Sequence, residues 1–223
     1  MLRLTNYRLY ALCIMICMFH TMCAQEYKAT ENVADASIVT VGDSATVMHG
    51  DFKRHLYVKT NAVAWLLLIT NAEVEIDLGK HLTADMSIHC SAWNYFSDRC
   101  KYRVLSVYPG IRYWLDASNN GAFVGIHAGI ASYNMSMNGD YRIQDHDGNS
   151  PAIGGGISAG YRMSISRNRR WMAEVCLGAG VYDLHYDKFY NENNGLRAST
   201  VKKTGICLDH ASLSLCYVFD LKK

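Results

Sequence analysis

Polar and apolar residues alternate along most of the chain from about residue 58 onward. Between residues 82 and 92, six apolar residues occupy one parity and five polar residues occupy the other. Successive side chains of a β-strand point to opposite faces, so this period of two predicts strands. The pattern predicts eight strands, at 58–66, 73–78, 82–92, 104–115, 122–133, 152–163, 171–182 and 206–219. We find no helical periodicity in this part of the sequence.

The predicted connections between these strands also follow a pattern. Three are short, at 79–81, 116–121 and 164–170, and three are long, at 93–103, 134–151 and 183–205; the first, 67–72, is a short connection on the side of the long ones. Bacterial outer-membrane barrels combine short periplasmic turns with long external loops. The sequence therefore predicts an all-β fold, an eight-stranded antiparallel up-and-down transmembrane β-barrel with a periplasmic N-terminus. A ten-stranded barrel is the alternative.

The first part of the chain carries a different pattern. Arg3 and Arg8 precede a short apolar run at 10–19, and Cys23-Ala24-Gln25 follows it. This is typical of a secretory signal peptide, and the run is too short for a transmembrane helix. We expect residues 1–24 to be a signal peptide cleaved after Ala24, with a lipidated Cys23 as the alternative. Residues 25–57 would form a polar periplasmic extension, with a short hairpin at 37–48, and 58–223 the outer-membrane barrel.

Charged and aromatic residues fall on opposite parities near the predicted periplasmic end. The inward charges are Lys59, Asp77, Asp85, Arg112, Arg162 and Glu174. Three cations facing three carboxylates predict a closed ion-pair network, which satisfies buried charge. The outward aromatic residues at the same level are Tyr113, Tyr161, Trp171, Tyr217 and Phe219. Amphipathic rings favour a membrane interface, so these residues predict a periplasmic aromatic girdle.

Glycines on the inward parity would leave room for larger side chains, and Pro109 predicts a bulge.

Composition refines this picture. The 223 residues fit one compact domain, and Lys and Arg number 22 against 20 Asp and Glu. Subtracting Arg3 and Arg8 leaves 20 basic and 20 acidic residues, so the mature chain is formally neutral. Such a balance argues against nucleic acid as a partner. The mean hydropathy is close to zero, as expected for a barrel whose lipid-facing and inward residues alternate.

Candidate chemistry is sparse. The sequence contains no CxxC or HExxH spacing, so it predicts neither a metal site nor a cofactor. Cys90 and Cys100 bracket one predicted turn and could form a disulfide, although small apolar cysteines within strands are the alternative. The weak catalytic candidates are Asp145, His146 and Asp147 in one loop and Asp183 and His185 in another, where solvated turn residues are the simpler interpretation. The predicted inward histidines, His89, His127 and His210, are interpreted as satisfied lumen residues.

Several local strings together resemble a known family. They are Lys59-Thr60-Asn61; Glu75-Ile76-Asp77-Leu78-Gly79-Lys80; Trp93-Asn94-Tyr95-Phe96; Pro109-Gly110-Ile111-Arg112-Tyr113-Trp114; Tyr186-Asp187-Lys188; and Ser212-Leu213-Ser214-Leu215-Cys216-Tyr217. The segment 58–219 resembles the domain-of-unknown-function family numbered 3575, regarded as small bacterial outer-membrane β-barrels. The resemblance implies a fold and a location in the Gram-negative envelope. It implies no activity and no catalytic residues.

Three hypotheses about function remain from the sequence. The first is a non-enzymatic outer-membrane barrel with an envelope-structural or surface-interaction role, carried by loops 93–103, 134–151 and 183–205. Its expected partners are outer-membrane lipid and the barrel-insertion machinery. The second is a small lipid-modifying enzyme that uses rim His and Asp residues. The third is a soluble periplasmic binder of the lipocalin kind, which requires the apolar parity to face inward. Eight strands leave an interior filled by side chains, which argues against a diffusion pore.

Overall fold

The computed structural model describes residues 54–94, 99–116 and 120–221. The predicted signal peptide and the predicted hairpin at 37–48 therefore lie outside the described residues. Within them the elements are β1 (His55–Asn61), α2 (Ala62–Leu66), β2 (Thr70–Asp77), β3 (Leu82–Asn94), β4 (Cys100–Trp114), β5 (Gly121–Met137), β6 (Tyr141–Asp145), β7 (Ala152–Ser164), β8 (Trp171–Tyr190) and β9 (Arg197–Asp220).

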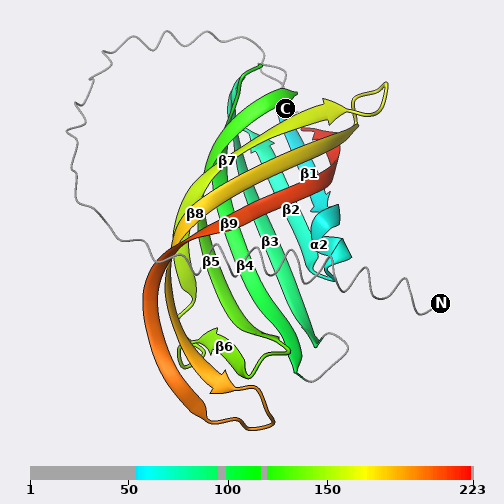
Figure 1. Ribbon diagram of the computed structural model, residues 1–223. Coiled ribbons are helices and arrows are strands. Elements are labelled where there is room, and N and C mark those ends of the chain that lie inside the picture. Colours follow the sequence, from blue (N-terminus) through cyan, green and yellow to red (C-terminus); the bar gives the residue numbers. More distant parts are fainter. Residues whose placement is uncertain (1–53, 95–98, 117–119, 222–223) are drawn as a thin grey trace, which may run out of the picture.

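Eight of these strands close into an antiparallel ring in the order β1-β2-β3-β4-β5-β7-β8-β9, and β9 pairs back with β1. The prediction of an eight-stranded up-and-down barrel is confirmed in this respect (Figure 1). The ninth strand, β6, is an addition: it bridges β5 and β8 beyond the end of β7. We call the end that carries the β2–β3, β4–β5 and β7–β8 turns the short-turn end, and the opposite end the distal end.

Residues 62–66 were expected to continue the first strand, but they form the short helix α2. The side chain of Asn61 accepts a hydrogen bond of 2.9 Å from the backbone N–H of Val63, which caps the helix and ends β1. The apolar run that follows Asn61 has no period of two, so the pattern could not place the strand end. Across the described residues, no helix is long and apolar enough to cross a membrane.

The last two barrel strands are longer than predicted. β8 continues to Tyr190 and β9 begins at Arg197, so most of the predicted loop 183–205 is a two-stranded extension. This extension of β8 and β9 projects past the other strands at the distal end, with β6 beside it (Figure 1). β1 also begins three residues earlier than expected, at His55, so the end of the predicted polar extension belongs to the barrel.

The bulge lies elsewhere than predicted. Pro109 pairs with Met86 of β3, and β4 keeps the same register against β5 on either side of it. The register instead shifts at two places between β8 and β9, and at the first of them Gly178 faces His210 while Ala179 faces Leu208. Asp209 is the extra residue of this bulge, which lies near the middle of β9.

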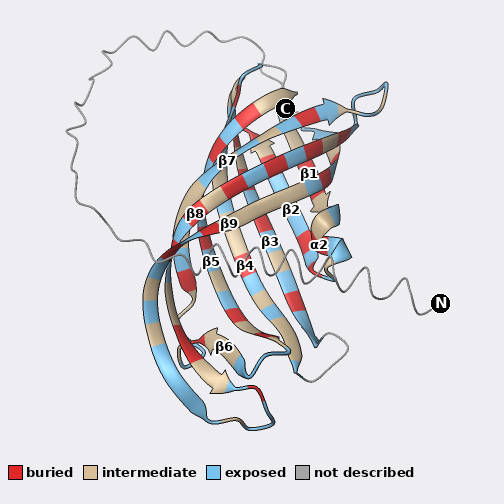
Figure 2. Cartoon of the chain, in the orientation of Figure 1, coloured by how far each residue is buried: buried red, intermediate tan, exposed pale blue. Residues whose placement is uncertain are grey.

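The barrel is polar inside and apolar outside. Buried and exposed residues alternate along the strands in Figure 2. Lys59 and Arg162 are only 2% and 0% exposed, whereas Ile126 and Ile157 are 62% and 69% exposed. At the short-turn end the interior closes on a small apolar floor, made by Tyr57, Trp114, Phe123, Met172, Cys176, Cys216 and Val218.

Candidate functional site

Seven charged side chains lie above this floor and fill the barrel interior. We call them the charge layer: Lys59, Glu73, Glu75, Asp85, Arg112, Arg162 and Glu174. They come from six of the eight ring strands, because each occupies the inward parity of its strand. Three cations face four carboxylates. The layer therefore ties opposite walls of the barrel together through charge-assisted hydrogen bonds.

Glu174 is the centre of the charge layer. Its carboxylate lies 2.8 Å from Arg112 Nη1 and 3.2 Å from Lys59 Nζ, and it accepts a hydrogen bond of 2.8 Å from Arg162 Nε. The Arg162 guanidinium also lies over the Trp114 ring, 4.3 Å from its centroid. A guanidinium that stacks on an aromatic face keeps its N–H groups available for carboxylates, and this arrangement suits a buried arginine. Every charged group of the layer has an oppositely charged partner within it, although Glu75 Oε1 and Arg162 Nη1 are buried without a hydrogen bond.

The structure brings together five of the six residues predicted for this network. The exception is Asp77, whose carboxylate instead lies 2.8 Å from His55 Nδ1 at the short-turn end. Glu73 and Glu75 take part in its place: Glu73 lies 2.7 Å from Lys59 Nζ, and Glu75 pairs with Lys59 and Arg162. They share the parity of Asp77 in β2, so the alternation already placed them on the inward face. The prediction was wrong only about which inward residue of β2 lies at the height of the network.

The predicted girdle residues lie on the outer face. Tyr113, Tyr161, Trp171 and Phe219 are each between 43% and 50% exposed, and Tyr217 is half-buried between two of them. The ring of Tyr217 lies 4.9 Å from that of Trp171 and 4.8 Å from that of Phe219. All five are near the short-turn end, on β4, β7, β8 and β9.

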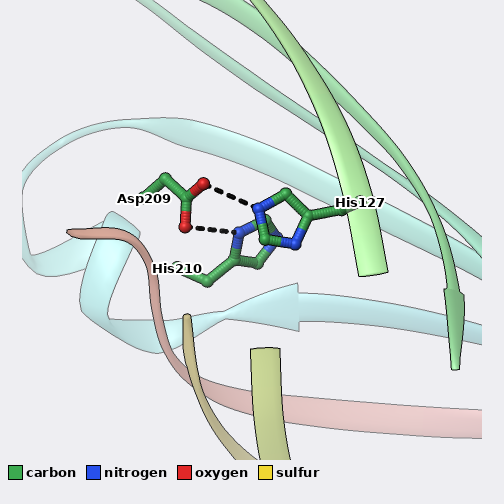
Figure 3. A group of neighbouring side chains, drawn as sticks. All are labelled: His127, Asp209 and His210. Carbon is green, nitrogen blue, oxygen red and sulfur yellow. Dashed lines mark hydrogen bonds and ion pairs between the residues drawn. The ribbon is translucent and has the colours of Figure 1, made fainter. Parts of the chain in front are cut away.

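A second group of polar side chains lies on the distal side of the charge layer. We call it the histidine layer: His89, Tyr108, His127, Tyr182, Asp209 and His210. Asp209 is its centre, with Oδ2 located 2.6 Å from His127 Nε2 and accepting a 2.7 Å hydrogen bond from the Tyr182 hydroxyl. His210 Nδ1 lies 3.4 Å from Asp209 Oδ1. Figure 3 shows the carboxylate joined to both imidazoles.

The bulge explains why consecutive residues of β9 share this interior. Before it, Cys207 faces inward, and after it, Ser214 and Cys216 face inward, so the inward parity changes from odd to even. Asp209 and His210 stand at the change, and both side chains are turned into the barrel, 3% and 13% exposed. Bulges re-aim side chains in this way and are frequent next to functional sites. The predicted inward histidines are thus placed in the interior, whereas Asp209 was missed.

The two weak catalytic histidine candidates lie at the distal end. The ring centroids of His146 and His185 are 4.0 Å apart, so the structure brings the two side chains together. The neighbouring Asp145 is buried, but Asp183 lies on the exposed face of β8 and accepts a hydrogen bond of 3.4 Å from Thr204. The carboxylates that contact His146 belong to Asp147, a neighbour of His146 in the predicted loop, and to Asp187, which the sequence marks only within a family string.

Asp187 organises this distal contact. Its Oδ1 lies 2.9 Å from His146 Nδ1 and accepts a hydrogen bond of 2.6 Å from Thr200, while Oδ2 lies 3.1 Å from Arg197. Burial raises the pKa of the Asp187 carboxyl, but the hydrogen bonds from Thr200, His146 and the Asp147 backbone outweigh it and lower that pKa to about 2. We call the group of His146, Asp147, Asp187, Arg197 and Thr200 the distal clasp, because it fastens β6 and its turn to the β8–β9 extension.

No disulfide joins Cys90 to Cys100. Cys90 is exposed on the outer face of β3 and faces Thr70 and Leu105, while Cys100 faces Met137 of β5. The alternative interpretation, cysteines as small residues within strands, fits this placement.

Comparison with known proteins gives one match. The sequence profile of a family described as "Protein of unknown function (DUF3575)" matches residues 11–219, nearly the whole chain. No curated protein and no solved structure matches. The match agrees with the family that the local strings resemble.

Proposed function

Since the chain belongs to the DUF3575 family of proteins of unknown function, we propose its role from the fold: it is a non-enzymatic integral barrel of the Gram-negative outer membrane. The N-terminus and the short-turn end face the periplasm. The distal end, with the β8–β9 extension, faces outside and carries an envelope-structural or surface-interaction role.

One observation carries this proposal: the apolar surface runs around the whole ring. Each of the eight ring strands exposes a large apolar side chain on the outer face: Val58, Val74, Met86, Leu105, Ile126, Ile157, Leu177 and Ile206, between 39% and 69% exposed. Soluble monomers rarely expose contiguous apolar patches above a few hundred Å², and a continuous belt marks contact with lipid or protein. Since the belt surrounds the barrel, a lipid bilayer is the partner that covers all of it.

The interior supports the same proposal. A soluble barrel that carries an apolar ligand needs apolar side chains inside, but Arg112 and Arg162 lie inside while Tyr113 and Tyr161 lie outside. The outward aromatic residues at the short-turn end match the interfacial ring preference of Tyr and Trp. The polar interior, the apolar belt and the outward aromatic residues near one end all support a barrel that spans a membrane.

The distal end supports a surface role. The extension of β8 and β9 rises past the belt, and its residues Arg197–Thr200 are exposed. The distal clasp and β6 hold this extension in one shape, so it presents a fixed surface rather than a loose loop. Fixed loops on a rigid barrel are where recognition residues are usually located.

The proposal predicts heat-modifiable mobility. In fractionated cells the protein should be found in the outer membrane, and on a denaturing gel the unboiled protein should migrate differently from the boiled protein. Closed barrels resist detergent until heated, because all ring strands are paired. A protein recovered in the soluble periplasmic fraction with no mobility shift would contradict the proposal.

A matched pair of variants tests the belt itself. Ile157→Arg places a charge within the belt and should lower the free energy of unfolding of the barrel in the membrane by about 2–4 kcal/mol. Ser199→Arg places the same charge on the exposed distal extension and should leave the heat-shift temperature unchanged. If both variants behave alike, the belt does not face lipid.

A further inference from the structure

Asp209 is a buried carboxylate with unusual neighbours. Its side chain is 3% exposed, and among the described residues its ion-pair partners are His127 and His210, with no Lys or Arg. In the charge layer, by contrast, every carboxylate lies against Lys59 or an arginine. A buried carboxylate is costly without a cation. Its positive partner is therefore either a protonated imidazole or a bound metal ion.

Possible ligand atoms of the two histidines converge on this carboxylate. Asp209 Oδ1 and His210 Nδ1 are buried and form no hydrogen bond, although they lie 3.4 Å apart. His127 Nε2 lies 2.6 Å from the other carboxylate oxygen, and the His127 side chain is 4% exposed. One ligand atom from each of the three residues can be chosen so that all lie within 4.8 Å of one another.

We propose that His127, Asp209 and His210 bind a divalent first-row transition-metal ion, with Zn²⁺ as the reference ion, inside the barrel. Imidazole nitrogens and a carboxylate oxygen are ordinary zinc ligands, at about 2.0–2.2 Å from the ion. Ligand atoms of a tetrahedral ion at those distances lie about 3.3 Å apart. The 3.4 Å spacing of His210 Nδ1 and Asp209 Oδ1 matches this value. His127 Nε2 reaches the same ion by moving away from Asp209 Oδ2.

The surroundings fit a built site. The Tyr182 hydroxyl donates a hydrogen bond of 2.7 Å to Asp209 Oδ2, as the outer partners of metal-bound carboxylates do. The Tyr108 ring packs against His210 at 5.1 Å and against His127 at 6.3 Å. Both contacts restrict the imidazole rings. Of the two register shifts between β8 and β9, the one at Gly178 and Ala179 turns Asp209 and His210 inward together.

Three protein ligands leave a position open, as in zinc sites that bind water or a small ligand. The His210 side chain is 13% exposed, more than the His127 and Asp209 side chains at 4% and 3%. The distal clasp also groups His146, Asp147 and Asp187. There, however, Arg197 already pairs with both carboxylates and would repel a metal ion. The proposal therefore goes to the histidine layer alone, and it holds whether or not the barrel lies in a membrane.

The test is metal binding by the full folded chain, purified in detergent with a chelator and without a polyhistidine tag. We expect one equivalent of Zn²⁺ in competition with a chromophoric chelator, and visible ligand-field bands when Co²⁺ is added. His127→Gln and His210→Gln should each weaken binding at least about tenfold, since outer-partner losses alone weaken metal sites ~10–100-fold. Tyr182→Phe should weaken it within that ~10–100-fold range.

His185→Gln is the matched control, because it removes a histidine of the distal end and should leave binding unchanged. A circular dichroism spectrum with the β-sheet content of the wild-type chain shows that each variant is folded, so loss of binding is not loss of fold. Failure of the folded wild-type chain to bind Zn²⁺ and Co²⁺ would overturn the proposal and assign the charge to a protonated histidine. Binding that survives both His127→Gln and His210→Gln would overturn it too.

Discussion

At the scale of single residues, Arg112 shows how the interior holds its charges. Its guanidinium lies within 3.3 Å of four carboxylates, those of Glu73, Glu75, Asp85 and Glu174. The side chain is 3% exposed, so water replaces few of these contacts if the guanidinium is lost. One residue therefore stabilises the acidic half of the charge layer.

We predict that Arg112→Met destabilises the barrel by about 3–5 kcal/mol, because breaking a buried ion pair leaves uncompensated charge. The measurement is the heating temperature at which the folded band is lost on a gel. Arg170→Met is the control: that guanidinium pairs with Asp220 at 45% and 65% exposure, and an exposed pair contributes about 0–1 kcal/mol. Equal temperatures for the two variants would show that the charge layer does not stabilise the fold.

The sequence predicted correctly which charged side chains point into the barrel, but it predicted only some of their ion-pair partners. Alternation placed Lys59, Arg112 and Glu174 inside, because parity is a local property. Whether Asp77 or Glu73 meets Lys59 depends on the stagger between strands, which no single strand records. Asp209 was missed for a related reason: the bulge that turns it inward appears only when β9 is aligned against β8.

At the scale of elements, β5, β7 and β8 pack closely because inward glycines make room for rings from other strands. A Cβ on Gly129 would lie 2.5 Å from the Tyr182 hydroxyl oxygen. A Cβ on Gly180 would lie 2.5 Å from Asp209 Oδ2 and 2.8 Å from the Gly155 carbonyl oxygen. The second contact involves backbone, which cannot rotate away.

Gly180→Ala should therefore destabilise the barrel by about 1–3 kcal/mol, the usual cost of an overpacked interior. The same heat-shift midpoint on gels measures it. Gly79→Ala provides the comparison, because a Cβ there meets nothing within 4 Å. A Gly180→Ala midpoint as high as that of Gly79→Ala would mean that the interior at this level is looser than the structure indicates.

Elements were predicted best where one face is apolar and the other polar. The strand ends of β3 and β7 came within two residues of the structure for this reason. The pattern failed past residue 182, where both faces of the β8–β9 extension carry polar residues and the period of two disappears. It failed again at α2, where an apolar run without alternation follows the capping residue Asn61.

At the scale of the whole molecule, the interior is closed by successive layers. The floor residues Trp114 and Phe123 are 0% and 1% exposed, and the charge layer above them includes Arg162 at 0%. The histidine layer follows. Side chains from nearly all ring strands thus cross the axis, as expected for an eight-stranded barrel.

We therefore predict that the barrel does not conduct small solutes. Liposomes that contain the purified protein should swell in an isotonic sugar solution no faster than protein-free liposomes. A large porin in the same lipid is the positive control, since its roughly 16–18 strands leave an aqueous channel. The ring of this protein has eight strands. Swelling at a porin-like rate would contradict the closed interior.

The pairing of the first ring strand with the last also governs how the chain is made. β1 and β9 meet over seven residue pairs, although about 150 residues separate them along the chain. Until β9 pairs with both of them, β1 and β8 each present an unpaired backbone edge, which invites association with other chains. The ring cannot close before β9 is in place, so unpaired chains must be kept apart from one another until that strand has paired.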